Sequence, residues 1–397
     1  MAVFTLATLI SPWVLGICGS KLTLVLGSSC FTLFLASFLY VHYLPYYATS
    51  LLLGFGFALY YTGNGQYITE RSTRETIERN SSVVWAIGAG CMVIGGCVML
   101  FTISPPPAPL DQTVHSENAT ESIFAGKSYR QYSDSEIRLL YGAFALVALC
   151  SNIIFALLPS RRVAGALETK NSARVGFLEQ LNVMAATLTD ARMIKLIPAF
   201  CFVGNISSFW IMVYPTTLIF TKKLSQHIYL PAYYSMCVGC GSFTIGLFTS
   251  FMAKRIPNFG QKPTFLMGLT LEMTALTLAL VSTPAWSTNS PNDGETLLEP
   301  NFFLSLFIGV CFGMADNCLN NSRTIIAALV YPENRAQALS ISKLYQSLTS
   351  CIILFTSTLF SLPMHFACLS INGVLAAITF LHTVNRMRDV ETKMPGK

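Results

Sequence analysis

The chain of 397 residues is 53% hydrophobic and only 11% charged, with a mean hydropathy of +0.54, whereas soluble domains carry about 25% charged residues. Apolar stretches of about 20 residues, the length that crosses a hydrocarbon core, recur along nearly the whole sequence, so the lipid bilayer is expected to be the main solvent. The net charge of +6 does not indicate a nucleic-acid partner, because the basic residues form no continuous stripe.

The apolar stretches predict about eleven transmembrane helices and therefore an all-α, polytopic membrane protein. Five precede a polar stretch, near residues 2–18, 20–42, 44–68, 81–103 and 138–158. Six follow it, near residues 194–220, 229–253, 263–284, 300–325, 337–360 and 363–385. The predicted organisation is thus an N-terminal transmembrane half (1–158), a cytosolic linker (159–193), and a C-terminal transmembrane half (194–397) that ends in a short cytosolic tail.

Cysteine chemistry and enzyme motifs are not indicated. Most of the twelve cysteines lie within apolar stretches, where cysteine behaves as a small apolar residue, so no disulfide framework is predicted. Cys237 and Cys240 have the spacing of a metal or redox pair but lack a second pair, and we interpret them as packing residues. We expect no metal and no cofactor. The absence of a nucleophile elbow, a phosphate loop and a zinc signature argues against an enzyme.

The distribution of lysine and arginine predicts the orientation in the membrane. Of the 25 basic residues, 19 fall on the side that holds the C-terminus, five on the other side, and Lys343 within a helix. The C-terminus is therefore predicted to be cytosolic, in the plasma membrane or in an endomembrane. The same orientation places the loop 104–137 outside, where Asn118 of an Asn-Ala-Thr sequence is predicted to be glycosylated.

An internal repeat relates the two predicted halves. At an offset of 241 positions, Gly19, Ser20, Lys21 and Gly27 align with Gly260, Gln261, Lys262 and Gly268. At an offset of 255 positions, Gly54, Phe57 and Glu78 align with Gly309, Phe312 and Glu333. A parallel repeat of six plus six helices with a long cytosolic connection is typical of the major facilitator fold. The helix near 194–220 has no counterpart, so we expect five plus six helices here, either because the start codon lies upstream or because a natural isoform has an extracytosolic N-terminus.

Two segments resemble UNC-93-like proteins of the major facilitator superfamily. The first comprises residues 61–69 (YTGNGQYIT) and 77–86 (IERNSSVVWA), and the second comprises residues 313–320 (GMADNCLN) and 343–347 (KLYQS). They are similar to the fourth and fifth, and the tenth and eleventh, helices of that family. The chain departs from the family in its missing first helix, in Tyr61 where tryptophan is usual, and in lacking the acidic-plus-arginine loop signature of sugar and drug transporters.

The resemblance implies a transporter fold and two alternative roles. The first is a secondary transporter that carries an unknown small solute or ion by alternating access. The second is a non-transporting accessory or regulatory subunit of another membrane protein, such as a potassium channel. The first role is our leading hypothesis, and its expected partners are the lipid bilayer and the solute.

Ionisable residues at membrane depth are functional candidates, because a charge in hydrocarbon is costly. Glu272 and Asp316 lie about 14 Å deep and Lys343 about 9 Å deep, at about 1.5 Å per helical residue. Consecutive antiparallel helices carry Asp316 and Lys343, which predicts an ion pair between them. Asn320 and Arg323 share the helical face of Asp316, so Arg323 is a rival partner. An exchange of partners that gates the protein and a static pair that fixes packing both remain open.

The other polar residues within the helices allow two interpretations. Glu272 has no evident partner in the sequence and is either a proton-coupling site or a neutral acid bonded to a neighbouring helix. Candidates for lining a central cavity are Asn64, Gln66, Asn205 and Gln346. Hydrogen bonds between helices are the alternative role for these four side chains.

Overall fold

The computed structural model describes residues 1–40, 42–102, 134–160, 163–167, 176–227 and 229–393. Within this part of the chain the structure is α-helical and holds no β-strand beyond a single bridge between Thr221 and Asn292. The all-α prediction is therefore confirmed. Asn118 lies outside the described residues, so its glycosylation stays a prediction.

The first helix, α1 (Ala2–Ser37), is broken at Gly19, where φ is 77°. This left-handed backbone favours glycine, which has no Cβ to clash with the following carbonyl. The chain reverses direction there, because the contacts with α2 (Tyr43–Thr69) run parallel before the break and antiparallel after it. They are Val3–Gly54 and Ser11–Thr62 before it, and Leu24–Gly63 and Gly27–Tyr60 after it. Two separate helices were predicted here, and the structure confirms them.

The remaining membrane helices follow in the predicted order. They are α3 (Ile77–Thr102), α5 (Asp134–Leu157), α8 (Ile197–Ser208), α9 (Tyr214–Phe220), α10 (Leu230–Arg255), α11 (Lys262–Ser282), α12 (Phe302–Val330), α13 (Arg335–Thr356) and α14 (Leu362–Lys393). A π-helical turn, η1 (Phe209–Val213), joins α8 to α9. Nine helices of the described part are long and apolar enough to cross a membrane. The break in α1 and the 27-residue helix α2 bring the number of long segments close to the predicted eleven.

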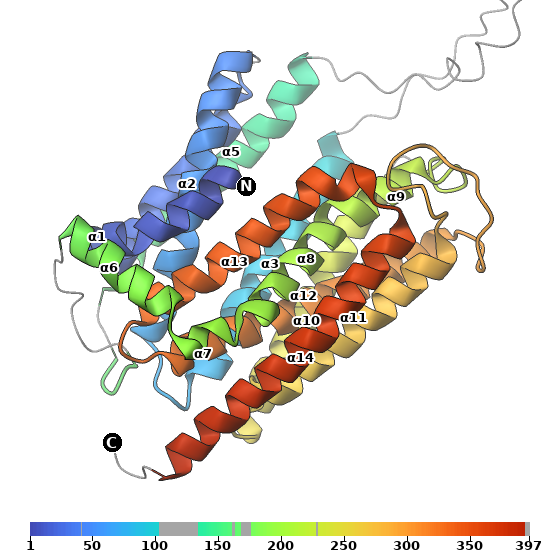
Figure 1. The fold of residues 1–397 in the computed structure, drawn as a ribbon. Coiled ribbons are helices and arrows are strands. Elements are labelled where there is room, and N and C mark those ends of the chain that lie inside the picture. The colour runs from blue at the N-terminus through green and yellow to red at the C-terminus, as the bar shows by residue number, and fades with distance from the viewer. Residues whose placement is uncertain (41, 103–133, 161–162, 168–175, 228, 394–397) are drawn as a thin grey trace, which may run out of the picture.

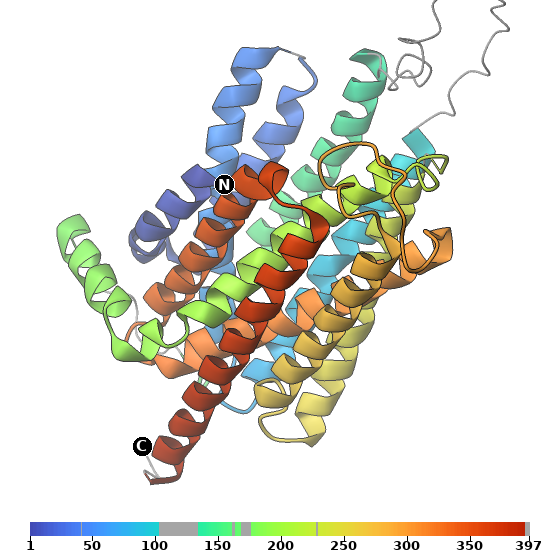
Figure 2. The ribbon, with the colours of Figure 1, turned by 45° about the vertical axis from the view of Figure 1, so that its right-hand side comes forward.

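The predicted linker contains two short helices, α6 (Phe177–Leu188) and α7 (Ala191–Ile194). The helices before it contact those after it through α3 with α10 and α12, and through α13 with α1 and α2. Figures 1 and 2 show α14 on the outer face, next to α8 and α11. The division into halves at residues 159–193 stays a prediction.

The larger buried apolar cluster of the described residues lies between Met184 and Val384, where large aromatic side chains are fully buried. They are Phe200, Phe202, Phe209, Tyr214, Phe265, Phe312 and Phe380. Helix α5, by contrast, has no buried residue, and several of its apolar side chains, such as Leu139, Leu146 and Leu157, are exposed, as lipid-facing side chains are. Glycines bring α3 against α10: a Cβ on Gly239 or Gly246 would lie within 2.8 Å of atoms of α3. Small residues at such contacts allow close approach of membrane helices.

Candidate functional site

A small pocket lies where α2 and α3 meet α12 and α13. The cavity is about 10 Å³, room for about one water molecule, and its lining residues are Tyr61, Asn64, Gly65, Trp85, Arg323, Thr324, Leu339 and Lys343. Two of these side chains are cations, and both are nearly excluded from the surface: Arg323 is 4% exposed and Lys343 is 5% exposed. The pocket therefore combines buried positive charge with aromatic and amide groups.

Helical spacing explains why these residues share one pocket. Tyr61, Asn64 and Gly65 stand three and four residues apart along α2, and Leu339 and Lys343 stand four apart along α13. Side chains at these spacings project from the same face of a helix. Each of the two helices thus presents one compact group of side chains to the pocket.

Neutral groups surround both cations of the pocket. The Lys343 ammonium lies 3.8 Å from the centroid of the Tyr61 ring and 5.4 Å from that of Trp85, which is cation–π geometry. The Arg323 guanidinium donates to the Ser342 hydroxyl at 2.5 Å and to the Thr324 hydroxyl at 3.1 Å. Its buried Nε has no hydrogen-bond partner among the described residues. Neither cation is neutralised by a direct ion pair in the described part of the chain.

The predicted ion pair between Asp316 and Lys343 is not formed, and neither is the rival pair with Arg323. No ion pair within 4.0 Å involves Asp316 in the part of the chain that the structure describes. One oxygen of this carboxylate instead accepts hydrogen bonds from three neutral donors, namely Trp210 Nε1 at 3.0 Å, Asn320 Nδ2 at 3.0 Å and Ser207 Oγ at 3.3 Å. These donors satisfy the acid while Lys343 stays on the aromatic rings, so the pairing prediction was wrong for this conformation.

Asp316, Asn320 and Gln346 form one polar network beside the pocket. Gln346 Nε2 lies 3.4 Å from Ser207 Oγ and 3.5 Å from Asn320 Oδ1, so Ser207 connects α8 to both α12 and α13. Asp316 also interacts electrostatically with the two cations of the pocket. The network therefore couples the carboxylate to the charge of the pocket without direct contact.

The remaining candidates make no hydrogen bond to either of these two groups among the described residues. Glu272 is 0% exposed, and neither of its carboxylate oxygens has a hydrogen-bond partner among the described residues. Gln66 is buried and donates to Glu70 at 3.4 Å. Asn205 has a buried carbonyl oxygen without a partner in the same described part. Of the four cavity candidates only Asn64 lines the pocket, and the roles of all four stay predictions.

Sequence reasoning missed the aromatic residues of the site as functional groups. Tyr61 stands three residues before Asn64, so the helical spacing of α2 was enough to find it. Trp85 and Trp210 carried no such signal, because their positions depend on how α3 and η1 pack against other helices. Their indole rings nonetheless contact Lys343 and Asp316, respectively.

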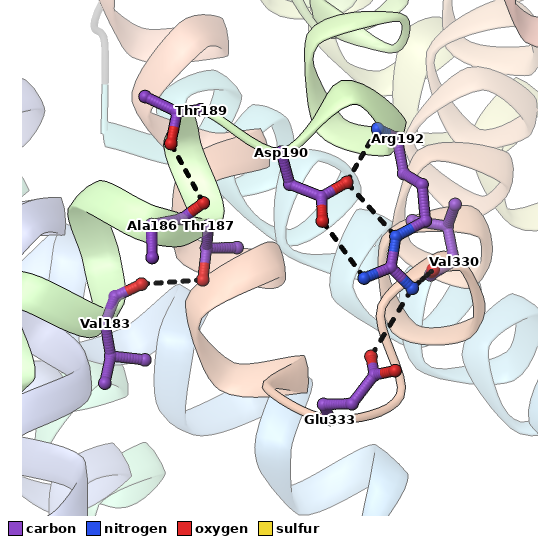
Figure 3. A network of polar contacts seen from close by, with 8 residues as sticks. All are labelled: Val183, Ala186, Thr187, Thr189, Asp190, Arg192, Val330 and Glu333. Atoms are coloured by element: carbon purple, nitrogen blue, oxygen red, sulfur yellow. Dashed lines mark hydrogen bonds and ion pairs between the residues drawn. The ribbon is translucent and has the colours of Figure 1, made fainter.

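A second polar network joins the short helix α7 to the loop between α12 and α13 (Figure 3). The Arg192 guanidinium donates twice to the Asp190 carboxylate, each time at 3.1 Å, and reaches Glu333 at 3.5 Å. It also lies 4.2 Å from the centroid of the Tyr331 ring. Hydrogen bonding between the two groups lowers the pKa of Asp190 and raises the pKa of Arg192. Arg192 therefore fastens the predicted linker to the helices that follow it.

Comparison with known proteins identifies the family. A family model described as "Ion channel regulatory protein UNC-93" matches residues 1–381, nearly the whole chain. The chain belongs to the UNC-93 family. The UNC93-like protein MFSD11 of Xenopus laevis is 22% identical over 400 residues, which cover 96% of this chain and 84% of that protein. MFSD11 of Xenopus tropicalis matches this UNC-93 family chain with the same identity and coverage.

Solved structures show the fold of this UNC-93 family chain. The fucose:proton symporter FucP of E. coli has a TM-score of 0.63 at 10% sequence identity and covers 96% of this chain and 89% of its own. The proton:xylose symporter XylE, bound to 6-bromo-6-deoxy-D-glucose, has a TM-score of 0.61 at 14% identity, with 95% and 83% covered. Both belong to the major facilitator superfamily, so the predicted fold class is confirmed, as the family model confirms the predicted family. The chain is an integral, multi-pass membrane protein with a transporter-like fold.

Proposed function

We propose that this UNC-93 family chain is a secondary transporter that moves a small solute by alternating access, and not an enzyme. One observation carries the proposal: helices α2 and α3 of the predicted first half and helices α12 and α13 of the predicted second half line one polar pocket. In secondary transporters the substrate site lies between two repeats, close to the middle of the membrane. The pocket is therefore the proposed solute site.

Hydroxyl groups next to this site support relative movement of the two halves. Ser11 of α1, Thr62 of α2 and Ser340 of α13 form a buried cluster, with oxygen–oxygen distances of 2.8, 2.9 and 3.3 Å. Each hydroxyl both donates and accepts hydrogen bonds, so it can exchange one hydrogen-bond partner for another. No ion pair has to break in this exchange, because the three groups are neutral. We propose that this cluster separates when the halves rock apart.

Loop contacts support a closed state at one end of the bundle. Glu78, at the start of α3, accepts hydrogen bonds from Gly260 N at 2.9 Å and from Gln261 Nε2 at 2.8 Å, and Arg74 donates to Asn258 at 3.1 Å. These bonds tie the loop between α2 and α3 to the loop between α10 and α11. We propose that this end faces the cytosol, together with the C-terminus, and that it opens in the other state.

Uptake into liposomes tests the proposal. The purified full chain is reconstituted and given a defined mixture of sugars, amino acids, carboxylates and nucleosides, and the solutes that enter are measured by mass spectrometry. We expect at least one solute to enter faster than into protein-free liposomes. Asn64→Trp fills the pocket and should abolish this uptake, whereas Leu146→Trp, on the exposed side of α5, should retain it. Equal uptake by Asn64→Trp and wild type contradicts the proposal.

The second candidate function is a non-transporting regulatory subunit of an ion channel, such as a potassium channel. Two observations favour it: the matching family is named for an ion channel regulatory protein, and α5 has no buried residue and so offers an unburied face. If no solute of the mixture enters the liposomes, co-reconstitution with a potassium channel is the next measurement. A change in channel current that Leu146→Trp removes would support this role.

A further inference from the structure

The pocket holds more positive charge than its described neighbours neutralise. Arg323 and Lys343 both line it, and one oxygen of the nearby Asp316 carboxylate accepts hydrogen bonds from three neutral donors. Glu272 lies fully buried on α11 and is not part of the lining. One acidic and two basic groups therefore leave a net positive charge at the site.

Both cations also keep hydrogen-bonding capacity that no described residue uses. Among the described residues, the buried Nε of Arg323 has no acceptor, and the Lys343 ammonium lies over the faces of Tyr61 and Trp85 and makes no hydrogen bond or ion pair. A buried donor without an acceptor costs free energy, and a buried charge without a counterion costs more. An incoming anion that accepts from both groups would remove these costs. The arrangement is thus suited to a negatively charged ligand.

From this geometry we infer that the pocket binds a small organic anion through its carboxylate. The inference rests on the proposed function, because it names the solute class for the same pocket. A carboxylate matches the planar fork of arginine and accepts several hydrogen bonds, so Arg323 would hold its oxygens while Lys343 turns from the Tyr61 ring towards them. The aromatic walls formed by Tyr61 and Trp85 suit a planar apolar body. The cavity is only about 10 Å³ in this conformation, so the ligand must be small and must displace the Lys343 side chain when it enters.

Benzoate and benzamide form a matched pair of probes, because they share shape and ring and differ in charge. Unfolding of the purified full chain in detergent is followed by heating at increasing concentrations of each compound. We expect benzoate to raise the midpoint of unfolding in a saturable manner and benzamide to leave it unchanged, because a ligand that binds only the folded state stabilises that state.

Variants then locate the binding. Lys343→Met retains roughly the length of the side chain and removes its charge. This variant and Arg323→Gln should each weaken benzoate binding on the order of tenfold or more. Lys254→Gln, an exposed position at the end of α10, should bind benzoate as wild type does. Arg323 also bonds Ser342 and Thr324, so if Arg323→Gln does not fold, Lys343→Met and the comparison of the two probes still decide.

Three outcomes overturn the inference: equal stabilisation by benzamide and benzoate, no stabilisation by benzoate at all, or wild-type affinity of Lys343→Met for benzoate. The transport proposal fails separately. If benzoate binds by its charge but no solute enters the liposomes, the anion site stands and the transport proposal fails. If a neutral solute enters and Lys343→Met does not alter its uptake, the transport proposal stands and the anion site fails.

Discussion

Replacing Glu272 by methionine should stabilise the folded protein. The side chain is 0% exposed, and neither carboxylate oxygen has a hydrogen-bond partner among the described residues. Its helix neighbours one turn away are Gly268 and Leu276, and Gly268 packs against Cys318 and Leu319 of α12. These neighbours are apolar or small, and the nearby acid Asp316 only repels a charged carboxylate. A buried polar group without a partner costs about 1–3 kcal/mol, and methionine has a similar length and no such group.

The free energy of unfolding of Glu272→Met should therefore exceed that of wild type by about 1–3 kcal/mol, measured by titrating the detergent-solubilised chain with sodium dodecyl sulfate and following its helical content. Glu272→Gln is the control, because it keeps a polar group in the same place and should bring no gain. A loss of stability in Glu272→Met would refute the reasoning, since it would mean that the carboxyl group makes a favourable contact. A gain in stability together with lost uptake would indicate a proton-coupling role.

Two further predictions concern packing and pH. A Cβ on Gly313 would lie 1.9 Å from the Val238 carbonyl oxygen, so Gly313→Ala should lower the free energy of unfolding by about 1–3 kcal/mol. Gly95→Ala is the control: nothing lies within 4 Å of a Cβ there, so its free energy of unfolding in the same titration should be close to that of wild type. The pKa of Asp190 is lowered by Arg192, so this pair stabilises the fold above the ordinary carboxyl pKa and loses that contribution as the pH falls through the lower, folded-state value. Since the pair is partly exposed, its contribution to the free energy of unfolding should be about 0.2–1 kcal/mol. Thermal unfolding between pH 7 and pH 3 should show this loss of stability in wild type and not in Asp190→Asn.

Hydropathy was sufficient to predict the helices, because each membrane helix must satisfy its own backbone hydrogen bonds over a long apolar stretch. The break at Gly19 was predictable too, since a short polar interruption containing glycine separates two apolar runs. Asp316, Asn320 and Arg323 were correctly placed near one another because the relation depends only on spacing along α12. Contacts within one helix, or between a helix and its lipid, are encoded locally.

Contacts between helices were harder to predict, and the error at Asp316 shows why. Opposite charges on adjacent antiparallel helices gave a reasonable pair, but the sequence does not state how each helix is rotated. In the structure, α12 turns Asp316 towards Ser207 and Trp210, and α13 turns Lys343 towards Tyr61. Neutral donors and aromatic rings compete with an ion pair for a buried charge, and their positions follow from tertiary packing alone.

The π-helical turn η1 has a consequence for how tolerant this site is to insertions and deletions. Within it the backbone N–H of Tyr214 bonds to the carbonyl of Phe209, five residues back, so the helix carries an extra residue there compared with an α-helix. The Trp210 carbonyl accepts instead from the Tyr234 hydroxyl of α10 at 2.8 Å, and its indole holds Asp316. Loss of one residue from this turn would rotate the following helix by about 100° and carry Tyr214 away from its neighbours. The length of the chain in this stretch is therefore constrained as well as its buried side chains.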